Sequence, residues 1–291
     1  PGRAVVALVL THNAPGALTR CLSAIAAQTT PPGGVIVVDN ASVPPVRAAA
    51  LDTRAEAGAR VPSVSVVRSD TNTGPAGGWA LALERFLGTD YDFAWVLDDD
   101  MVADPRCLEV LLAHAATDPK RAFLFPWSVQ PDGSVGEWSS WCGFLVSRHV
   151  VAEAGVPRAE LFWWAEDTEY LRWRIPQAGF ERRVVDGALV QHDAVRRTGH
   201  VPTWKYYYEA RNMLYLHLHV MHRVGWYPRN VTKLIARAVV RERGNRVRSL
   251  AAIARGLADG ARGRLGVRVA VQDLAEQAVP DHDGASAGSP V

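Results

Sequence analysis

Short apolar, β-branched runs alternate with helix-like segments over the first 125 residues, and this alternation constrains the fold more than any other feature. The strand-like runs are Val5–Leu10, Val35–Val38, Val64–Val67 and Phe93–Leu97. Helices are predicted around Leu18–Ala26 and at Ala76–Phe86 and Pro105–His114. Strands that alternate with helices form βαβ units, so the pattern predicts an α/β fold whose mostly parallel sheet has helices on both faces.

Polar side chains follow all four predicted strands. They lie in the segments 11–13, 39–40, 70–72 and 98–100. Ligands of parallel sheets bind beyond the carboxyl ends of the strands, so we expect a binding site where these segments meet.

Three consecutive aspartates, Asp98, Asp99 and Asp100, come directly after the fourth apolar run. Neighbouring carboxylates raise one another's pKa unless a cation is present. Hard oxygen ligands suit Mg²⁺ or Mn²⁺, which recruit phosphate oxygens to complete their coordination. Asp98 and Asp100 can face one ion while Asp99 makes other contacts. A solvated turn or a helix cap, where Asp is also favoured, is the alternative interpretation.

A second acidic pair, Glu166 and Asp167, follows Trp163 and Trp164 at the start of a predicted helix. A carboxylate bordered by tryptophans is suited to accept a proton from an acceptor hydroxyl as a general base. Acidic residues in a first helical turn also complement the helix dipole, and this is the structural alternative.

Two further segments carry weaker signals. His192 ends a segment in which two short apolar stretches flank a turn at Gly187, and its imidazole either completes a metal site or is structural. The stretch Asn72–Gly78 is rich in glycine but contains neither GxGxxG nor a P-loop lysine, which excludes the classical dinucleotide and P-loop NTPase folds.

Composition and charge exclude several classes of function. The net charge of +2 argues against general nucleic-acid binding, and three widely spaced cysteines argue against a disulfide framework or zinc site. The cysteine pattern fits a reducing cytoplasm. No apolar run reaches 18 residues and the chain begins with a strand-like segment, so we expect neither a transmembrane helix nor a signal peptide. We predict a catalytic domain over 1–203, a basic helical region over 204–279 and a disordered tail over 280–291.

The order and spacing of these motifs resemble glycosyltransferase family 2, the inverting enzymes of GT-A fold, over roughly residues 3–215. The resemblance is carried by Val9–Asn13, Val37–Ser42, Asn72–Gly78, Leu97–Asp100, Glu166-Asp167 and His192. Within the family, Asn72–Gly78 and Tyr206–Asn212 are similar to segments of bacterial rhamnosyl- and galactofuranosyltransferases of cell-envelope assembly.

The resemblance implies a metal-dependent hexosyltransferase and a role for each matched position. The implied donor-binding residues are Thr11, Asn13, Asp39, Asn72, Gly77, Gly78, Asp98 and Arg211. The implied ligands of Mn²⁺ or Mg²⁺ are Asp98, Asp100 and His192. Asp167 would be the catalytic base, with Glu166 positioning substrate hydroxyls, and Trp163 and Trp164 would border the acceptor.

The implied partners are a UDP- or dTDP-sugar donor and a polyprenyl-linked or small-molecule glycan acceptor. The basic C-terminal helices either form a solvated face or rest on the inner face of the cell membrane. Two alternatives to this enzyme remain: a non-catalytic sugar-nucleotide-binding module and a nucleotidyltransferase. Nucleotidyltransferases typically begin with a Gly-rich loop that carries Arg or Lys, and segment 11–16 lacks these features. Self-association into a homo-oligomer stays open.

Overall fold

A computed structural model describes residues 4–47, 63–130, 132–137, 140–193, 201–223, 225, 227–242 and 244–271. Its strands are β1 Val5–Thr11, β2 Gly34–Asp39, β3 Ser63–Arg68, β4 Phe93–Asp98, β5 Met101–Ala103, β6 Phe123–Val129, β7 Val135–Gly136, β8 Cys142–Ser147 and β9 Arg183–His192. In the described residues they form one nine-stranded sheet of order β3-β2-β1-β4-β8-β6-β9-β5, with β7 paired to β6. All but β5, β7 and β8 run in one direction.

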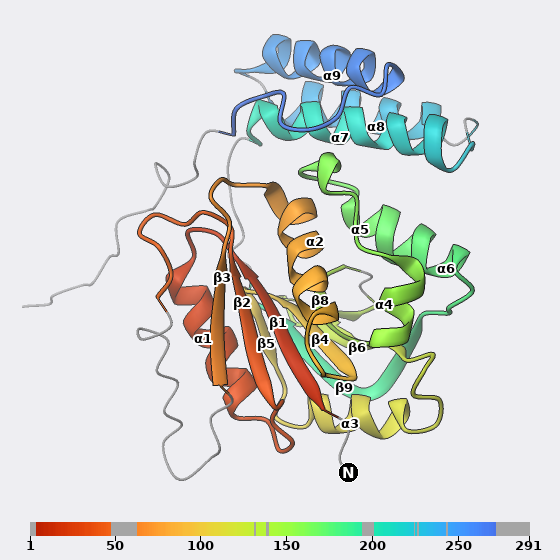
Figure 1. Cartoon of the computed structure of the whole chain (residues 1–291). Coiled ribbons are helices and arrows are strands. Elements are labelled where there is room, and N and C mark those ends of the chain that lie inside the picture. Colours follow the sequence, from red (N-terminus) through yellow and green to blue (C-terminus); the bar gives the residue numbers. More distant parts are fainter. Residues whose placement is uncertain are drawn as a thin grey trace, which may run out of the picture.

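Helices cover both faces of this sheet and one of its ends (Figure 1). The α-helices are α1 Pro15–Ala26, α2 Gly74–Leu87, α3 Cys107–Ala115, α4 Arg148–Ala154, α5 Glu166–Glu169, α6 Ile175–Gln177, α7 Thr203–Tyr215, α8 Tyr227–Arg241 and α9 Arg246–Ala261. Shorter helical turns are η2 Ala159–Leu161, η3 Tyr170–Arg174 and η4 Leu216–Val220.

Strand β1 shows why the central runs are apolar throughout. Val5, Ala7 and Val9 pack in the core shared with α1 and α3. The alternate residues Val6, Leu8 and Leu10 pack in the core shared with α2 and α4. Side chains alternate between the two faces of a strand, so a strand covered on both faces loses the polar alternation of a half-exposed one.

The predicted α/β class, the mostly parallel sheet with helices on both faces and the helical C-terminal extension are confirmed. Each predicted strand is present, with its ends moved by one residue at most. The segment before His192 differs, because it is one ten-residue strand, β9, rather than two stretches around a turn. Gly187 has φ 82° and lies at an irregularity of the β6–β9 pairing, so the left-handed glycine makes a bulge.

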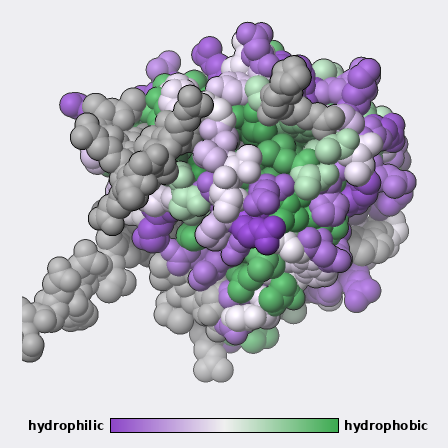
Figure 2. All heavy atoms as spheres, turned by 90° about the horizontal axis from the view of Figure 1, so that it is seen from below, coloured by the Kyte–Doolittle hydropathy of each residue, from purple (hydrophilic) through white to green (hydrophobic). Residues whose placement is uncertain are grey.

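Helices α7, α8 and α9 form a layer beyond the carboxyl ends of the parallel strands (Figure 1). Glycines allow α9 to approach α7 closely, since a Cβ at Gly256 or Gly260 would lie 2.3 or 2.4 Å from a backbone oxygen of α7. Seen from the opposite side, the surface mixes hydrophilic and hydrophobic side chains (Figure 2). None of the described helices is long and apolar enough to span a bilayer. The predicted tail 280–291 and residues 272–279 lie outside the described residues.

Candidate active site

A cavity of about 1250 Å³ lies between the strand ends and the α7–α8 part of the helical layer. Its floor consists of Thr11, His12, Asn40, Asn72, Asp98, Asp99, Asp100 and His192. Its wall consists of Trp163, Trp164, Glu166 and Asp167. Its roof consists of Trp204, Lys205, Glu209, Met213, Tyr227, Asn230, Lys233, Leu234 and Arg237. The structure thus brings most of the predicted site residues into one cavity; Asn13, Asp39, Gly77, Gly78 and Arg211 do not line it.

The three aspartates of the floor have different surroundings. Thr11 donates its hydroxyl to Asp99 Oδ2 over 2.6 Å, and His192 Nε2 lies 3.2 Å from Asp100 Oδ2. Burial, followed by the charges of Asp100 and Asp99, raises the pKa of Asp98 well above its ordinary value. Burial also raises the pKa of Asp99 to about 7. Without a cation, the buried floor therefore favours the protonated form of Asp98 and Asp99.

The floor combines donor groups that suit a cation. Asp98, Asp100 and His192 line one cavity and combine two hard carboxylates with an imidazole, a donor set that fits Mn²⁺ or Mg²⁺. Within the described part of the chain, no three His, Cys, Asp or Glu side chains converge closely enough to hold an ion by themselves. An ion held here would therefore take further ligands from a bound diphosphate and water, and the metal site stays a prediction.

His12 organises the opposite edge of the floor. Its Nδ1 lies 2.7 Å from the carbonyl oxygen of Asn40, and its Nε2 lies 3.2 and 3.1 Å from the side-chain nitrogens of Asn13 and Asn72. A carbonyl only accepts, so we assign the proton to Nδ1, and Nε2 then accepts from both amides. The sequence placed His12 in a polar strand end but did not single it out.

Asn13 and Asp39 support the floor from behind. The Asn13 side-chain oxygen accepts from the backbone N–H of Val43 over 2.7 Å. Asp39 is fully buried, and although burial disfavours its charge, hydrogen bonds from Ser42, Val46 and Arg68 outweigh this and lower its pKa. Both residues thus hold the loop after β2, and their predicted contacts with a nucleoside remain untested.

The glycines of segment 72–78 allow close packing. A Cβ at Gly78 would lie 2.4 Å from Leu10 Cδ1, and one at Gly77 would lie 2.5 Å from Thr73 Cβ. Gly74, which does line the cavity, has φ 67°, and a Cβ there would lie 2.0 Å from the carbonyl oxygen of Phe162. These positions bring α2 against β1 and against the wall.

Left-handed backbone shapes the loop that leads into the wall. Phe162, Trp164 and Ala165 have φ values of 63°, 75° and 68°, which are unfavourable for residues with a Cβ. Such conformations persist where the surroundings enforce them, and they concentrate at functional sites. Here they direct Trp163 and Trp164 into the cavity just before α5 begins.

Asn212 of α7 holds this loop in place. Its side-chain amide nitrogen shares its two N–H groups among three backbone oxygens, those of Leu161 at 2.9 Å, Trp163 at 2.8 Å and Trp164 at 2.8 Å. The side chain is fully buried, so these hydrogen bonds are shielded from water. The segment Tyr206–Asn212, which carried part of the family resemblance, therefore supports the wall through Asn212 and lines the cavity through Glu209.

Arg211 has a similar supporting position. It is fully buried, stacks over the ring of Tyr208 at 4.7 Å, and donates to the carbonyl oxygens of Leu161 and Gly266. It does not line the cavity, so the structure offers it no direct route to a donor phosphate in this conformation. Its guanidinium instead ties α7 to the wall loop and to the segment after α9.

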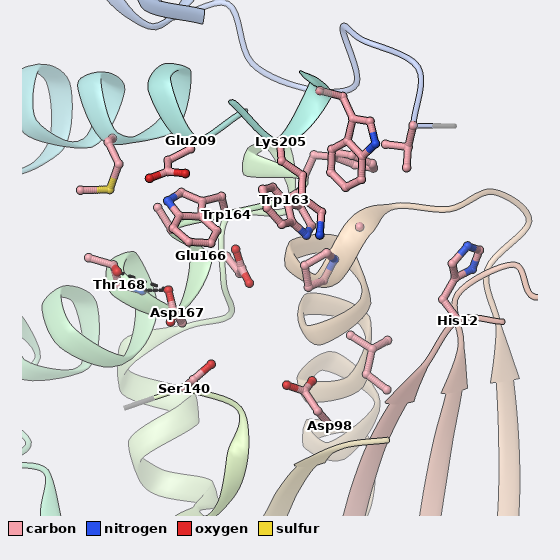
Figure 3. A pocket seen from close by; sticks show the side chains of 18 of the residues that line it. His12, Asp98, Ser140, Trp163, Trp164, Glu166, Asp167, Thr168, Lys205 and Glu209 are labelled. Atoms are coloured by element: carbon pink, nitrogen blue, oxygen red, sulfur yellow. Dashed lines mark hydrogen bonds between the residues drawn. The ribbon is translucent and has the colours of Figure 1, made fainter. Parts of the chain in front are cut away.

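Glu166 and Asp167 lie on the wall near Thr168, across the view from His12, and Asp98 lies below them (Figure 3). Burial, and then the charge of Asp167, raises the pKa of Glu166 to about 8. Burial also raises the pKa of Asp167, although the backbone N–H of Thr168, 2.6 Å from its Oδ1, and the charge of Arg172 oppose this. A carboxylate with a raised pKa is a stronger base than one in water.

The roof was missed by sequence reasoning. Lys205 lies over the rings of Trp163 and Trp204 at 5.0 and 5.4 Å, and Arg237 donates to the carboxylate of Glu209. Lys205 and Glu209 point from α7 into the cavity (Figure 3). The sequence signals were the predicted basic helical region and the segment Tyr206–Asn212, which contains Glu209. Neither signal reveals which side chains face the strand ends.

Comparisons with known proteins agree with this architecture. The family model for "Glycosyl transferase family 2" matches residues 7–199. Galactofuranosyltransferase GlfT1 of Mycolicibacterium smegmatis is 38% identical over 114 residues, which cover 39% of this chain and 35% of that protein. GlfT1 of Mycobacterium tuberculosis is 39% identical over 114 residues, covering 38% and 35%. The match thus spans about a third of the length of these relatives.

Solved structures share the fold at low sequence identity. S. aureus TarS 1-349 in complex with UDP-GlcNAc aligns with a TM-score of 0.53 and 15% identity, covering 90% of this chain and 92% of that one. GalNAc-T7 with UDP, GalNAc and Mn²⁺ aligns with a TM-score of 0.53 and 13% identity, covering 74% and 47%. These likenesses concern the fold alone, and they confirm the expected GT-A type.

Proposed function

The chain belongs to glycosyl transferase family 2, and from this membership we propose that it is a metal-dependent, inverting hexosyltransferase. We propose galactofuranose as the transferred sugar, with rhamnose as the second candidate, because the matched relatives are galactofuranosyltransferases. The donor would be a UDP- or dTDP-sugar. The acceptor would be a hydroxyl of a polyprenyl-linked cell-envelope glycan, with a soluble natural product as the alternative.

The observation that carries this proposal is the arrangement of three carboxylates around one cavity. Asp167 lies on the wall, and Asp98 and Asp100 lie on the floor. Asp167 accepts the proton of the acceptor hydroxyl, whose oxygen attacks the anomeric carbon as the bond to the nucleoside diphosphate breaks. Attack from the face opposite the leaving group inverts the anomeric configuration. A divalent ion held by Asp98, Asp100 and His192 would stabilise the negative charge of the diphosphate.

The test compares the parent with Asp167→Asn, using UDP- and dTDP-sugars with Mn²⁺ and mass spectrometry of the products. Removing a general base lowers the rate by about 10²–10⁴-fold, so we expect transfer by Asp167→Asn to fall into that range while UDP still binds. Asp70→Asn is the matched control, because Asp70 is exposed and does not line the cavity. Equal transfer by Asp167→Asn and the parent would contradict the assignment; UDP binding without turnover in the parent would favour a non-catalytic module.

We further propose that the helical layer contacts an anionic membrane peripherally. Four large apolar side chains are exposed near the α8–α9 junction: Ile235 at 38%, Val239 at 39%, Val240 at 69% and Val247 at 81%. Arg241, Arg246 and Arg248 stand among them and are exposed as well. Apolar residues flanked by arginines favour the interface of a bilayer with anionic lipids. A lipid-linked acceptor would be presented at that interface.

A further inference from the structure

The roof contains buried hydrogen-bonding atoms that have no partner in the protein. Within the described residues these are Tyr227 Oη, Asn230 Nδ2, Arg237 Nε and Trp204 Nε1, and all four residues line the cavity. A buried polar group without a partner costs about 1–3 kcal/mol. Four such groups on one surface call for a ligand that supplies the missing partners.

Three of these four residues form a row along α8. Tyr227, Asn230 and Arg237 are separated by three and seven residues, a spacing that places them on one face of α8, together with Leu234. Burial raises the pKa of Tyr227 to about 12, so its hydroxyl stays protonated and can donate. The indole, amide and guanidinium nitrogens also donate. The ligand that satisfies this row must therefore be rich in acceptor oxygens.

The charges of the residues that line the cavity further restrict the kind of ligand that can bind. The roof contributes Lys205, Lys233 and Arg237, of which Arg237 is paired with Glu209. The floor and the wall instead carry the acidic side chains of Asp98, Asp99, Asp100 and Asp167. An anion that enters the cavity without a metal ion is repelled by the carboxylates and attracted to the roof.

The cavity also has room for more than the donor. Pockets for small ligands typically enclose about 300–1,000 Å³, whereas this one encloses about 1250 Å³. We propose that Tyr227, Asn230, Lys233 and Arg237 form an acceptor subsite that binds a phosphate-bearing part of the acceptor. The subsite rests on the proposed function, because it holds the acceptor by its phosphate while the acceptor hydroxyl reaches Asp167.

The test titrates the full chain with inorganic diphosphate in the presence of a chelator, followed by calorimetry, and compares the parent with the double variant Asn230→Ala/Lys233→Ala. Both substitutions introduce the best helix former into α8. We expect at least tenfold weaker diphosphate binding by the double variant, with unchanged UDP affinity and no loss of thermal stability. Arg229→Ala is the control, because Arg229 lies on α8 but does not line the cavity. It should bind diphosphate as the parent does.

The outcomes separate this subsite from the proposed function. Equal diphosphate binding by the parent and the double variant would overturn the subsite, whatever the transferase activity. Displacement of the diphosphate by metal-free UDP would also overturn it, because the subsite and the donor site would then be the same. Retained diphosphate binding in a chain that shows no sugar transfer would refute the proposed function and leave the subsite standing. If the double variant loses binding to anionic vesicles but still binds diphosphate, these residues contact the membrane, and the subsite is overturned.

Discussion

Glu166 and Asp167 are neighbours in the sequence, but their surroundings differ. Asp167 accepts hydrogen bonds from the backbone and side chain of Thr168, and Arg172 lies close enough to favour its charge. Glu166 is buried, its Oε2 has no partner, and its pKa of about 8 keeps it protonated at neutral pH. Environments that distinguish adjacent carboxyl groups allow one to accept a proton while the other donates a hydrogen bond. We expect Glu166 to donate to a substrate oxygen.

This environment makes stability depend on pH. The pKa of Glu166 rises from 4.5 to about 8 on folding, so between these values the folded chain keeps a proton that the unfolded chain releases. Stability is therefore lost as pH rises through this window, by at most about 1.4 kcal/mol per pH unit. In Glu166→Gln the loss is absent. We expect the variant to gain thermal stability over the parent progressively from pH 5 to pH 8, and parallel unfolding curves across this range would contradict the assignment.

At the scale of elements, α7 connects the helical layer to the chemistry. Asn212 crosslinks three carbonyl groups of the loop before α5, and Arg211 adds a fourth hydrogen bond to the same loop. The base is thus positioned by a helix that begins more than thirty residues after it in the sequence.

Replacing Asn212 tests this positioning. Asn212→Ala removes two N–H donors to the loop and the oxygen that accepts from Arg211 Nε. At about 1 kcal/mol per hydrogen bond, we expect the unfolding free energy to fall by about 2–3 kcal/mol. The turnover number should fall at least tenfold, while the KM for the donor changes little because the floor is intact. Urea unfolding and steady-state kinetics measure both effects. Asn245→Ala is the control, because the side chain of Asn245 makes no capping hydrogen bond to α9. A variant with lowered stability and unchanged turnover would show that Asn212 only supports the fold.

The elements themselves were largely predictable, for a physical reason. The runs Val5–Leu10 and Phe93–Leu97 are apolar throughout because both of their faces are covered, and their polar ends marked the floor. The wall loop was not predictable in its shape. Phe162, Trp164 and Ala165 carry no local signal for left-handed backbone, and the hydrogen bonds that hold their loop come from Asn212, far along the sequence.

At the scale of the whole molecule, charge is distributed unevenly. Residues 201–271 contain fourteen Lys and Arg residues against three Asp and Glu residues, whereas the complete chain has a net charge of only +2. Glu209, Glu242 and Asp259, the three acidic residues, each bind a protein group: Arg237, Tyr206 and Tyr207. The layer therefore presents mainly positive charge to its surroundings. The net charge of the complete chain does not reveal this uneven distribution. Neither the position of the helical layer nor the residues of the roof follow from local sequence patterns.

This distribution leads to a prediction about membranes. The double variant Val239→Asp/Val240→Asp removes two apolar side chains from the exposed face of α8 and adds negative charge next to Arg241. Burying a valine side chain contributes about 1.5–3 kcal/mol, so we expect at least tenfold weaker co-sedimentation with vesicles containing phosphatidylglycerol. Val135→Asp, an exposed valine of β7, should co-sediment as the parent does. Undiminished vesicle binding by the double variant would refute peripheral contact through α8.

The bond from Arg211 to the carbonyl oxygen of Gly266 has a consequence for biosynthesis. Gly266 also donates its backbone N–H to the carbonyl oxygen of Glu160, so the segment after α9 closes against the wall loop from the far side. Protein synthesis proceeds from the N-terminus, and a nascent chain that still has residue 266 inside the ribosome lacks both of these bonds. The strands and the aspartates of the floor do not depend on these bonds, but we expect the wall loop to reach its final position only after residue 266 has left the ribosome.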